Sequence, residues 1–527
     1  MSILKRLIRT SWSTVDTTQL SGSNPHKVQN FVNGQWKSTS SSQTFPDPLN
    51  GNSFISVPNT SVPEASEFLK AAQKIPKSGL HNPFRDITRY KLYGSICENV
   101  ATNLHQSETF EFFWRLIQRA VPKSDEQAIA EMTVTRAFFE NFSGDQVRYL
   151  ARGFSVPGDR DGQQTSGYRW PYGPVAIISP FNFPLEIPVL QLMGALFMGN
   201  MVTIKPDPRV AICIEQFIRF LHHCGMPAGD LQLMNGQGEA IEHLIKQDVF
   251  RLIQFTGSSR VANVIAKESK GKVRIEDAGF DWKVLGPDVH DFEYVAYTSD
   301  QDAYAFSGQK CSAQSIVFAH ENWEKAGFFK RIGELAARRK LADLTIVPVI
   351  TWNNEKISNH VNEVLRIPGA KLLFGGAPIK EPHKIPSVYG SFLPTAVYVP
   401  IDQIEKNFDL VTRELFGPFQ IVTSWKDLTQ VLPLLERMEN HLTAAIVSND
   451  PVFLRKVLGS TVNGTTYAGI RARTTGAPQN HWFGPAGDPR GAGIGTQEAI
   501  KHVWSCHREI VTDTDTVPSD WVLPKCS

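Results

Sequence analysis

The sequence predicts an α/β protein with doubly wound parallel sheets, and three observations support this fold class. From about residue 173 onward, short runs rich in β-branched residues alternate with longer segments of helical periodicity. Repeated β-α-β order of this kind is typical of a parallel sheet covered by helices on both faces. A chain of 527 residues is too long for one ordinary core, so two or three domains are expected. Its hydrophobic content of 41% and charged content of 20% are those of a globular protein.

The elements of the first sheet follow one another closely along the chain. Strands are expected at 175–178, 201–204, 231–234 and 252–255, and helices at 187–198, from 212 to near 225, at 238–247 and at 259–269. Folds of this class bind ligands at the carboxyl ends of their strands, so this part of the chain is predicted to bind a nucleotide.

The remaining segments flank this sheet. A second α/β segment is expected over about 280–480, with a strand at 315–319 and a long helix through Phe328, Ile332 and Leu335. The stretch from 20 to 150 is predicted to be mostly helical. The segments 153–172 and 508–511 are predicted to be exposed strands that need a pairing partner.

The charge balance and the cysteines exclude several classes of protein. The chain has 54 basic and 52 acidic side chains and no basic run, so no nucleic-acid partner is expected. Its six cysteines are scattered without a Cys-x-x-Cys pair, which favours a reducing compartment, and no metal site is predicted. The longest apolar stretch, 189–198, is too short to cross a bilayer, so no membrane insertion is expected.

The first 20 residues have a composition of their own. Apolar residues at positions 3, 4, 7 and 8 alternate with Lys5, Arg6 and Arg9, and no acidic residue precedes Asp16. A basic, amphipathic and hydroxyl-rich start is typical of a mitochondrial targeting segment. A solvated tail is the alternative.

A thiol, a carboxylate and an amide carry the chemistry. Cys311 lies in a Ser-Gly-Gln-Lys-Cys-Ser segment and Glu276 in Arg-Ile-Glu-Asp-Ala-Gly. A thiolate can attack an aldehyde, and a carboxylate can activate the water that cleaves the resulting thioester. Asn182 stands in Ser-Pro-Phe-Asn-Phe-Pro, where its amide could donate to an oxyanion. A lone cysteine is more often a small buried hydrophobe, so Cys311 alone would not decide the matter.

Taken together, these motifs resemble the aldehyde dehydrogenase superfamily across nearly the whole chain. The motifs occur in the order of that family, at 180–184, 205–206, 255–258, 276, 308–311 and 414–418. The segment 307–313 resembles the Δ1-pyrroline-5-carboxylate (L-glutamate γ-semialdehyde) dehydrogenases. The segments 276–283 and 477–484 are similar to the plant branch of that activity, the twelfth aldehyde dehydrogenase family.

This resemblance implies a three-part architecture. It consists of a Rossmann-type NAD-binding domain at 21–153 and 173–277, an α/β catalytic domain at 278–497, and a small β oligomerisation arm at 154–172 and 498–527. Residues 1–20 would be the targeting segment. Family members usually form dimers or tetramers, so a homodimer or homotetramer in the mitochondrial matrix is expected.

The resemblance also implies the reaction. An NAD-dependent enzyme would oxidise L-glutamate γ-semialdehyde, formed from Δ1-pyrroline-5-carboxylate, to L-glutamate in proline catabolism. Cys311 would be the nucleophile that forms a thiohemiacetal and then a thioester. Asn182 and the backbone N–H of Cys311 would form the oxyanion hole, and Glu276 would be the general base for deacylation. A free thiol is only a few per cent ionised at neutral pH, so a helix N-terminus or nearby backbone donors are expected to activate Cys311.

The residues implied for NAD binding lie at the ends of the predicted strands. They are Ser179, Pro180, Phe181, Lys205, Gly257, Ser258, Glu414 and Phe416. The chain departs from the family pattern at Ala278 and Phe280, after the base, and at Ala262, where a second glycine is usual. Pro208 replaces a common ribose-binding glutamate. Asp207 would repel a 2′-phosphate and Arg209 would attract one, and NAD is favoured.

The substrate residues implied by the resemblance are Phe183, Ser312, Gly476, Ala477 and Phe483. Ser312 and the Gly476-Ala477 pair would bind the α-carboxylate, because small residues let backbone amides approach an anion closely. Phe183 and Phe483 would enclose the aliphatic stem. Glu131 is interpreted as an exposed helix acid rather than a ligand of the substrate ammonium, and the glycine-rich segment 491–495 as a flexible turn.

Three alternatives to this function remain open at the level of sequence. One is a broader ω-semialdehyde dehydrogenase, and another is a reductase that forms a semialdehyde from an acyl phosphate. A reductase would have no use for a hydrolytic Glu276. The third is an inactive scaffold on the same fold, which the presence of Cys311, Asn182 and Glu414 together disfavours.

Overall fold

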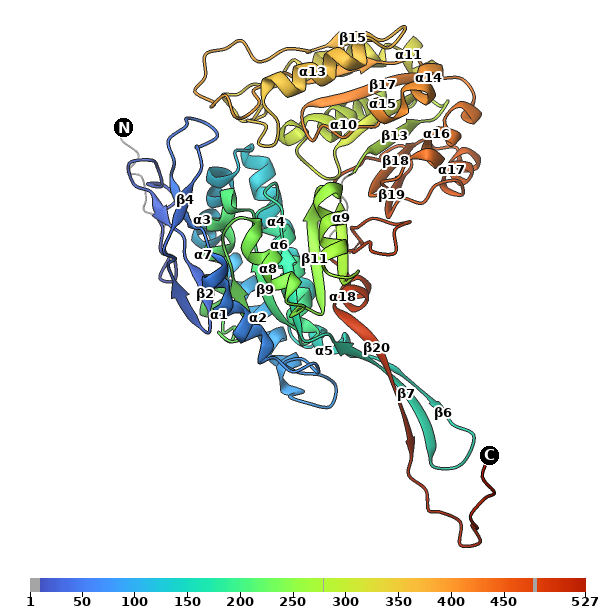
Figure 1. Cartoon of the computed structure of the whole chain (residues 1–527). Coiled ribbons are helices and arrows are strands. Elements are labelled where there is room, and N and C mark those ends of the chain that lie inside the picture. The colour runs from blue at the N-terminus through green and yellow to red at the C-terminus, as the bar shows by residue number, and fades with distance from the viewer. Residues whose placement is uncertain (1–9, 278, 477–480) are drawn as a thin grey trace.

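The computed structural model of the chain describes residues 10–277, 279–476 and 481–527. Two seven-stranded sheets form its two main bodies, and helices cover both (Figure 1). A narrow three-stranded arm projects from the side of the first body opposite the second.

The first sheet has the order β12-β11-β8-β9-β10-β2-β3, and its first five strands are parallel. The chain enters at the central strand β8, adds β9 and β10 on one side, and then returns to add β11 and β12 on the other. The carboxyl ends of β8 and β11 therefore flank a topological switch point, where a ligand crevice forms. The bounds are β2 (Asn30–Val32), β3 (Gln35–Lys37), β8 (Pro174–Ile178), β9 (Met201–Lys205), β10 (Leu231–Leu233), β11 (Leu252–Gly257) and β12 (Val273–Asp277).

Helices cover both faces of this sheet, and the apolar residues of each helix determine how much of it is buried. Residues 187–197 of α6 are all buried, because that helix is apolar on every side and lies inside the body. Helix α9 buries only Ala262 and Ile265 and is exposed on its other face. The helices of this body are α1 (Val62–Gln73), α2 (Thr88–Leu104), α3 (Ser107–Ala120), α4 (Asp125–Asn141), α5 (Gln146–Tyr149), α6 (Glu186–Phe197), α7 (Ala211–His223), α8 (Gly238–Lys246) and α9 (Ser259–Glu268), with the 3₁₀ turn η1 (Pro208–Val210).

The prediction that residues 20–150 are mostly helical was wrong for the first part of that stretch. Five strands precede α1, and none exceeds four residues: β2 and β3, together with β1 (His26–Lys27), β4 (Ser42–Thr44) and β5 (Ile55–Pro58). Strands this short show little alternation. They form because distant partners pair with them, as when Phe31 of β2 lies opposite Leu233 of β10. From α1 onward the stretch is helical, as predicted.

The second sheet has the order β15-β16-β17-β14-β13-β18-β19, and only β15 runs antiparallel to its neighbour. Its strands are β13 (Asp281–Leu285), β14 (Gln314–His320), β15 (Lys371–Phe374), β16 (Thr395–Tyr398), β17 (Phe419–Trp425), β18 (Thr443–Val447) and β19 (Thr465–Ala468). Its helices are α10 (Phe292–Tyr304), α11 (Glu321–Lys325), α12 (Phe328–Ala336), α13 (Asn354–Leu365), α14 (Ile401–Ile404), α15 (Phe408–Val411), α16 (Leu432–Arg437) and α17 (Pro451–Leu458), with the turns η2 (Ala305–Gly308), η3 (Glu405–Asn407) and η4 (Leu428–Gln430).

The helix through Phe328 is shorter than predicted. It has nine residues, because Gly327 adopts a positive φ of 90° and separates it from α11. Its apolar residues Phe328, Ile332 and Leu335 face the core, as the periodicity required.

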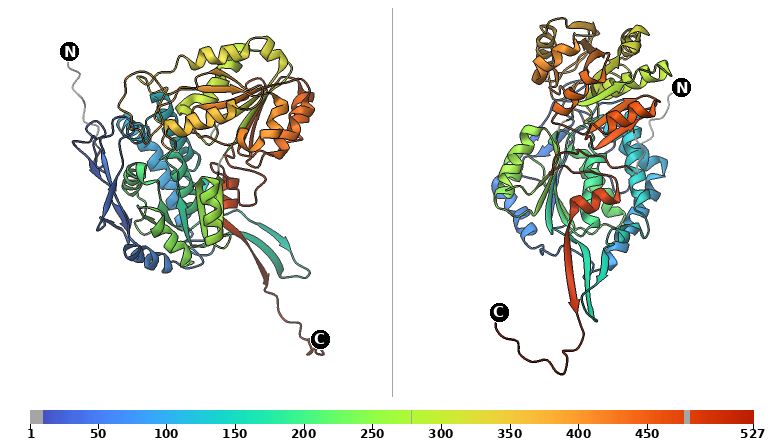
Figure 2. Two further views of the ribbon diagram at one scale, coloured as in Figure 1. Left: turned by 45° about the horizontal axis from the view of Figure 1, so that its top comes forward. Right: turned by 90° about the vertical axis from the view of Figure 1, so that its right-hand side faces the viewer.

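The arm combines two distant segments of the chain. Strands β6 (Phe154–Pro157) and β7 (Gln163–Pro171) form a hairpin, and β20 (Ser505–Asp513), which follows α18 (Gln497–Trp504), pairs antiparallel with β7. Figure 2 shows the arm extending away from both bodies. Val156 and Val511 are 47% and 62% exposed, so the arm presents apolar side chains and two open strand edges to its surroundings.

Within the described residues, no helix combines the length and the apolarity needed to cross a membrane. Residues 1–9, where most of the expected targeting pattern lies, fall outside the described part. Trp12, by contrast, packs against Phe112, Phe113 and Phe220.

Candidate active site

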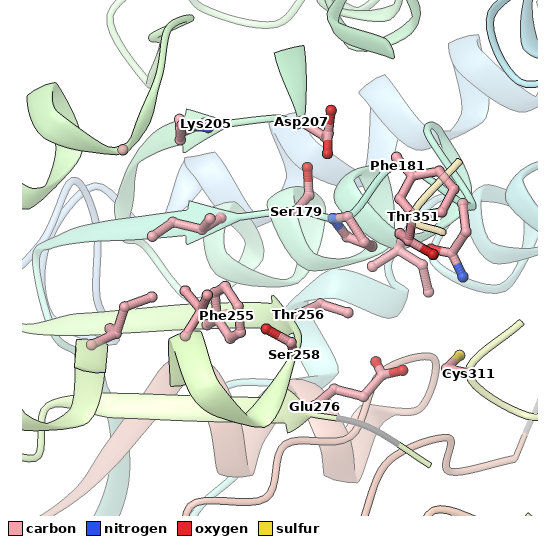
Figure 3. A pocket seen from close by; sticks show the side chains of 18 of the residues that line it. Ser179, Phe181, Lys205, Asp207, Phe255, Thr256, Ser258, Glu276, Cys311 and Thr351 are labelled. Carbon is pink, nitrogen blue, oxygen red and sulfur yellow. The ribbon is translucent and has the colours of Figure 1, made fainter. Parts of the chain in front are cut away.

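A cleft of about 640 Å³ opens between the two bodies, at the carboxyl ends of β8, β9, β11 and β12. The first body contributes most of its wall, and Cys311, Glu414 and Phe416 close it from the second body. Figure 3 shows Glu276 and Cys311 next to each other at one end, and Lys205 and Asp207 farther along the cleft. The predicted nucleophile, base and cofactor residues therefore share one cavity.

Cys311 is held at the end of a tightly constrained loop. Phe306, Ser307 and Gly308 have successive positive φ angles of 57°, 48° and 69°, which is rare and costly for the two non-glycine residues. Gly308 is required, because a Cβ atom there would lie 2.2 Å from the carbonyl oxygen of Gly417. The close approach of Gly308 to Gly417 thus fixes the path of the backbone just before the thiol.

The segment 347–350 supports this loop by hydrogen bonds. The Ser307 hydroxyl accepts from the backbone N–H of Val347 at 2.9 Å. The Gln309 amide oxygen accepts from the N–H of Ile350 at 2.8 Å, and its Nε2 donates to the carbonyl of Pro348 at 3.0 Å. These fully buried bonds offset the backbone strain.

The expected activation of Cys311 by a helix N-terminus was wrong. Cys311 follows η2 and precedes β14, and no helix begins at it. Instead, burial and the negative charge of Glu276 raise the pKa of the Cys311 thiol well above its ordinary value. The described part of the chain thus keeps this thiol protonated and requires a base to take its proton.

Glu276 is placed to be that base. It lies near the end of β12, is 3% exposed, and has no hydrogen-bond donor among the described residues other than the Cys311 thiol. Burial raises the pKa of Glu276 to about 7, and the thiol opposes that rise. A carboxylate with this pKa is a far stronger base than an exposed glutamate and is still ionised near neutral pH.

The altered motif after Glu276 retains one functional glycine. A Cβ atom at Gly279 would lie 2.4 Å from the carbonyl oxygen of Cys311, so only glycine allows the two segments to approach. The N–H of Gly279 donates to Glu414 at 3.3 Å. Phe280, the other departure from the family pattern, is buried in the core of the second body, and Ala278 lies outside the described residues.

Asn182 is buried beside the nucleophile loop. Its Nδ2 donates to the carbonyl of Gln309 at 3.1 Å, and its own carbonyl accepts from Lys123 Nζ at 2.8 Å. An amide nitrogen carries two N–H groups, so one is fixed by Gln309 and the second can serve an oxyanion. Both ends of the residue are therefore oriented by buried partners.

The interpretation of Glu131 as an exposed helix acid was wrong. Glu131 and Lys123 are both fully buried and form an ion pair at 2.9 Å. The other Glu131 oxygen accepts from the N–H of Leu185 at 2.9 Å, which holds the chain just after Asn182. The Lys123 ammonium also lies 4.7 Å and 4.4 Å from the ring centres of Phe183 and Phe306. Lys123 could not be predicted as part of the site from the sequence, because it stands in a loop with no motif around it.

The eight residues expected to bind NAD all line the cleft. Two polar features face the cleft: the buried Ser179 hydroxyl, which has no partner among the described residues, and the N-terminus of α9, where the Ser258 side chain makes no cap bond. A helix N-terminus and a free hydroxyl suit a pyrophosphate and its ribose. Burial lowers the pKa of the Lys205 ammonium and raises the pKa of the Glu414 carboxyl to about 8. The residues present therefore fit a dinucleotide.

An apolar part of the cleft was not predicted. Val261 and Val264 of α9 are 37% and 52% exposed and face the cavity opposite Ile241 and Ile245 of α8. Such a slot between two helices suits a flat aromatic ring. Two valines on the otherwise polar face of this amphipathic helix were the sequence feature that could have indicated the apolar slot. Ala262, in contrast, is fully buried against the sheet.

Comparison with known proteins gives the family. Residues 36–509 match the model of the aldehyde dehydrogenase family. The chain belongs to this family. It is 57% identical to the mitochondrial Δ1-pyrroline-5-carboxylate dehydrogenase 12A1 of Arabidopsis thaliana, over 97% of this chain and 93% of the relative. It is 58% identical to a probable aldehyde dehydrogenase of Linum usitatissimum, over 97% and 94% of the two chains.

Solved structures agree on the fold. Aldehyde dehydrogenase 21 from Physcomitrella patens superposes with a TM-score of 0.80 at 18% identity, covering 94% of this chain and all of that one. Membership makes this chain an NAD-dependent aldehyde dehydrogenase and an oxidoreductase. The predicted family and fold class are confirmed.

The substrate-side residues of this aldehyde dehydrogenase lie in separate surroundings. Phe183 packs against Phe306, Ser312 is buried directly after the nucleophile, and Phe483 pairs through its backbone with Ile494. Gly476 adopts a φ of 82°, and its carbonyl accepts from Arg473 at 2.6 Å. Ala477 lies outside the described residues.

The segment 491–495 is not a dinucleotide loop. Gly491 pairs with Ile275 of β12 and Ile494 pairs with Phe483, so short bridges hold the segment in place. The structure has no turn within these five residues, so the interpretation as a flexible turn was wrong.

Proposed function

We propose that this aldehyde dehydrogenase oxidises L-glutamate γ-semialdehyde, which forms from Δ1-pyrroline-5-carboxylate, to L-glutamate with NAD. The observation that carries the proposal is the pairing of Cys311 with a carboxylate of pKa about 7 in the cleft. A hydrolytic base has a use in oxidation to an acid and none in the reverse reduction of an acyl phosphate. The name of the Arabidopsis relative, at 57% identity, supports the choice of substrate.

The first step is addition to the aldehyde. Glu276 takes the proton of the Cys311 thiol, and the thiolate attacks the carbonyl carbon of the substrate to form a thiohemiacetal. The second N–H of the Asn182 amide and the backbone N–H of Cys311 stabilise the negative oxygen. Because Gln309 and Lys123 already orient Asn182, this stabilisation needs no reorganisation during the reaction.

NAD, when bound, supplies the hydride acceptor. Ser179, Pro180, Phe181, Lys205, Gly257, Ser258, Glu414 and Phe416 would hold it along the cleft. Glu276 first releases the proton of Cys311 to solvent and then takes a proton from water, which attacks the thioester and releases the acid. Cys311 leaves as a thiolate and is protonated again for the next cycle.

The pairing of Arg209 with Asp207, where the cleft would hold the adenosine of the cofactor, favours NAD over NADP. Arg209 donates to both oxygens of Asp207, at 2.9 Å and 2.6 Å, and also to the carbonyl of Ile350. Its guanidinium additionally lies 4.9 Å from the ring centre of Phe181. Since these partners occupy Arg209, its guanidinium is not free to bind a 2′-phosphate, and the Asp207 carboxylate beside it disfavours a second anion there.

Substrate selection would rest on Ser312 and on the loop at Gly476 and Ala477, which would bind the α-carboxylate. Phe183 and Phe483 would enclose the stem. We further propose the division into an NAD-binding domain (21–153 and 173–277), a catalytic domain (278–497) and an arm (154–172 and 498–527) that joins subunits of a homodimer or homotetramer. The exposed edges of the arm support this assembly.

We propose the mitochondrial matrix as the location, which the basic start of the chain and the name of the Arabidopsis relative support. Because Trp12 packs into the core, removal of a targeting segment would leave the core intact only if cleavage precedes that residue.

NADH formation tests the proposed reaction. The full-length enzyme is assayed with Δ1-pyrroline-5-carboxylate, with succinate semialdehyde and with an uncharged aldehyde such as propionaldehyde, each with NAD and NADP. Strong preference for the first substrate with NAD is expected, with no turnover in Cys311→Ala. Equal turnover of all three aldehydes would contradict the proposed substrate, and activity in Cys311→Ala would contradict the nucleophile.

A further inference from the structure

A buried ion pair behind the nucleophile carries one further inference. Lys283 of β13 and Asp302 of α10 are 0% and 2% exposed in their side chains, and their charged atoms lie 2.8 Å apart. Neither touches the cleft of the cofactor. Asp302 also stands in the last turn of α10, where the helix dipole disfavours a negative charge. The negative charge of Asp302 must therefore be stabilised by other partners.

Three donors stabilise the Asp302 carboxylate. One oxygen accepts from Lys283 and from the backbone N–H of Thr474, the latter at 2.8 Å. The other accepts from the Thr475 hydroxyl at 3.3 Å. Helix α10 is thereby tied to a loop 172 residues later in the sequence. Among the described residues, no helix or strand includes 474–476, and the bonds to Asp302 attach the loop to α10.

The attached loop is the one expected to bind the substrate carboxylate. Gly476 follows directly, with its left-handed φ and its carbonyl turned to the Arg473 guanidinium. Since the Thr474 N–H already donates to Asp302, the N–H groups of Thr475 and Gly476 are those left for an anion among the described residues of the loop. The electrostatic surroundings agree, because the ammonium groups of Lys283 and Lys310 and the guanidinium of Arg473 lie within range of one another.

We infer that Asp302, neutralised by Lys283, is a positioning residue that sets specificity for aldehydes with an α-carboxylate by fixing the loop 474–476. This inference rests on the proposed function and adds the device that aligns the loop with Cys311. Asp302 itself does not contact substrate. It acts through the Thr474 amide and the Thr475 hydroxyl.

The test variant is Asp302→Asn in the full-length enzyme. An amide of the same shape keeps one acceptor for Thr475, but its NH₂ cannot accept from the Thr474 N–H or from Lys283. The ratio of kcat/KM for Δ1-pyrroline-5-carboxylate to that for propionaldehyde should fall about tenfold or more. The fall should come from KM, with kcat for propionaldehyde nearly unchanged. Amide hydrogen exchange in the peptide that contains Thr474 should become faster.

Asp300→Asn is the matched control. Asp300 is buried in the same helix and paired with Arg339, but it makes no bond to the loop 474–476. Its variant should lose stability as well, yet leave both the substrate ratio and the exchange of the loop unchanged. If Asp300→Asn changes the ratio as much as Asp302→Asn does, the positioning role is overturned.

A gentler variant covers the case in which Asp302→Asn does not fold. Thr475→Val removes only the hydroxyl bond and leaves the buried charges intact, so a ratio about threefold lower is expected, and an unchanged ratio overturns the inference. The wild-type enzyme separates the two proposals. If wild-type kcat/KM is about equal for Δ1-pyrroline-5-carboxylate and propionaldehyde, the proposed substrate is overturned. If the wild-type enzyme strongly prefers Δ1-pyrroline-5-carboxylate and Asp302→Asn keeps that preference, only the positioning role of Asp302 is overturned.

Discussion

Replacing Glu276 by glutamine should make the enzyme inactive and, at the same time, more stable. The side chain is 3% exposed, and burial raises its pKa from 4.5 to about 7. The folded protein therefore holds the proton more tightly than the unfolded chain does. Ionisation of Glu276 consequently destabilises the fold as the pH rises from 4.5 to 7.

The magnitude follows from the shift. At about 1.4 kcal/mol per pKa unit, the rise corresponds to about 3 kcal/mol of stability that the ionised carboxylate costs above pH 7. Glutamine has nearly the same shape and no charge. Glu276→Gln should thus gain up to about 3 kcal/mol at pH 8, and the gain should vanish near pH 4, where the wild-type carboxyl is protonated in both states.

Activity should move in the opposite direction. Wild-type kcat/KM should rise through an apparent pKa near 7, because about one tenth of the carboxylate is ionised at pH 6 and about nine tenths at pH 8. The variant should lose about 10²–10⁴-fold in rate and lose this pH dependence.

Urea unfolding at pH 8 and pH 4, together with NADH formation from pH 5.5 to 9, measures both effects. Glu98→Gln, on an exposed position of α2, is the control and should change neither quantity. A Glu276→Gln protein that is less stable at pH 8, or that keeps the wild-type pH profile, would refute the assignment of Glu276 as a buried base.

Three more predictions follow from the site. Asp207→Ser frees the Arg209 guanidinium to bind a 2′-phosphate, so the ratio of kcat/KM with NADP to kcat/KM with NAD should rise about tenfold. An unchanged ratio would show that Asp207 and Arg209 do not determine the choice between the two cofactors. Gly308→Ala places a methyl group against a facing carbonyl at a positive φ, so activity should fall more than tenfold without loss of NAD binding in a fluorescence titration. Lys123→Met breaks a buried ion pair and releases the carbonyl of Asn182; it should destabilise the protein by about 3–5 kcal/mol in urea unfolding and lower kcat, and full activity would exclude a role in orienting the amide.

Much of the fold could be predicted from local patterns. The strands β8, β9, β10 and β11 and the helices between them were predicted to within two residues, because buried parallel strands are continuous apolar runs. The motifs around Cys311, Glu276 and Asn182 indicated the chemistry, because a thiol, a carboxylate and an amide each have few uses in such surroundings. The order of the motifs gave the family.

Other features depended on residues far apart in the sequence. The strands before α1 carry too few residues for a periodic signal and form only when β10 and one another are present. Glu131 looks like an exposed acid in its helix, yet the body of the protein buries it with Lys123. The pKa of Cys311 was misjudged because it depends on burial and on Glu276, which belongs to the other sheet.

Sequence by itself determined the fold class, the family and the identity of the reacting groups, since these depend on local periodicity and on residue chemistry. Only the tertiary structure decided that burial and Glu276 raise the pKa of the thiol, that Arg209 is engaged by Asp207, and that Lys123 and Asp302 are buried in ion pairs. The reason is physical: pKa values and ion pairing depend on how deeply the fold buries each group, and loop attachment depends on contacts such as that of Thr474 with Asp302, 172 residues apart, so no local pattern encodes them.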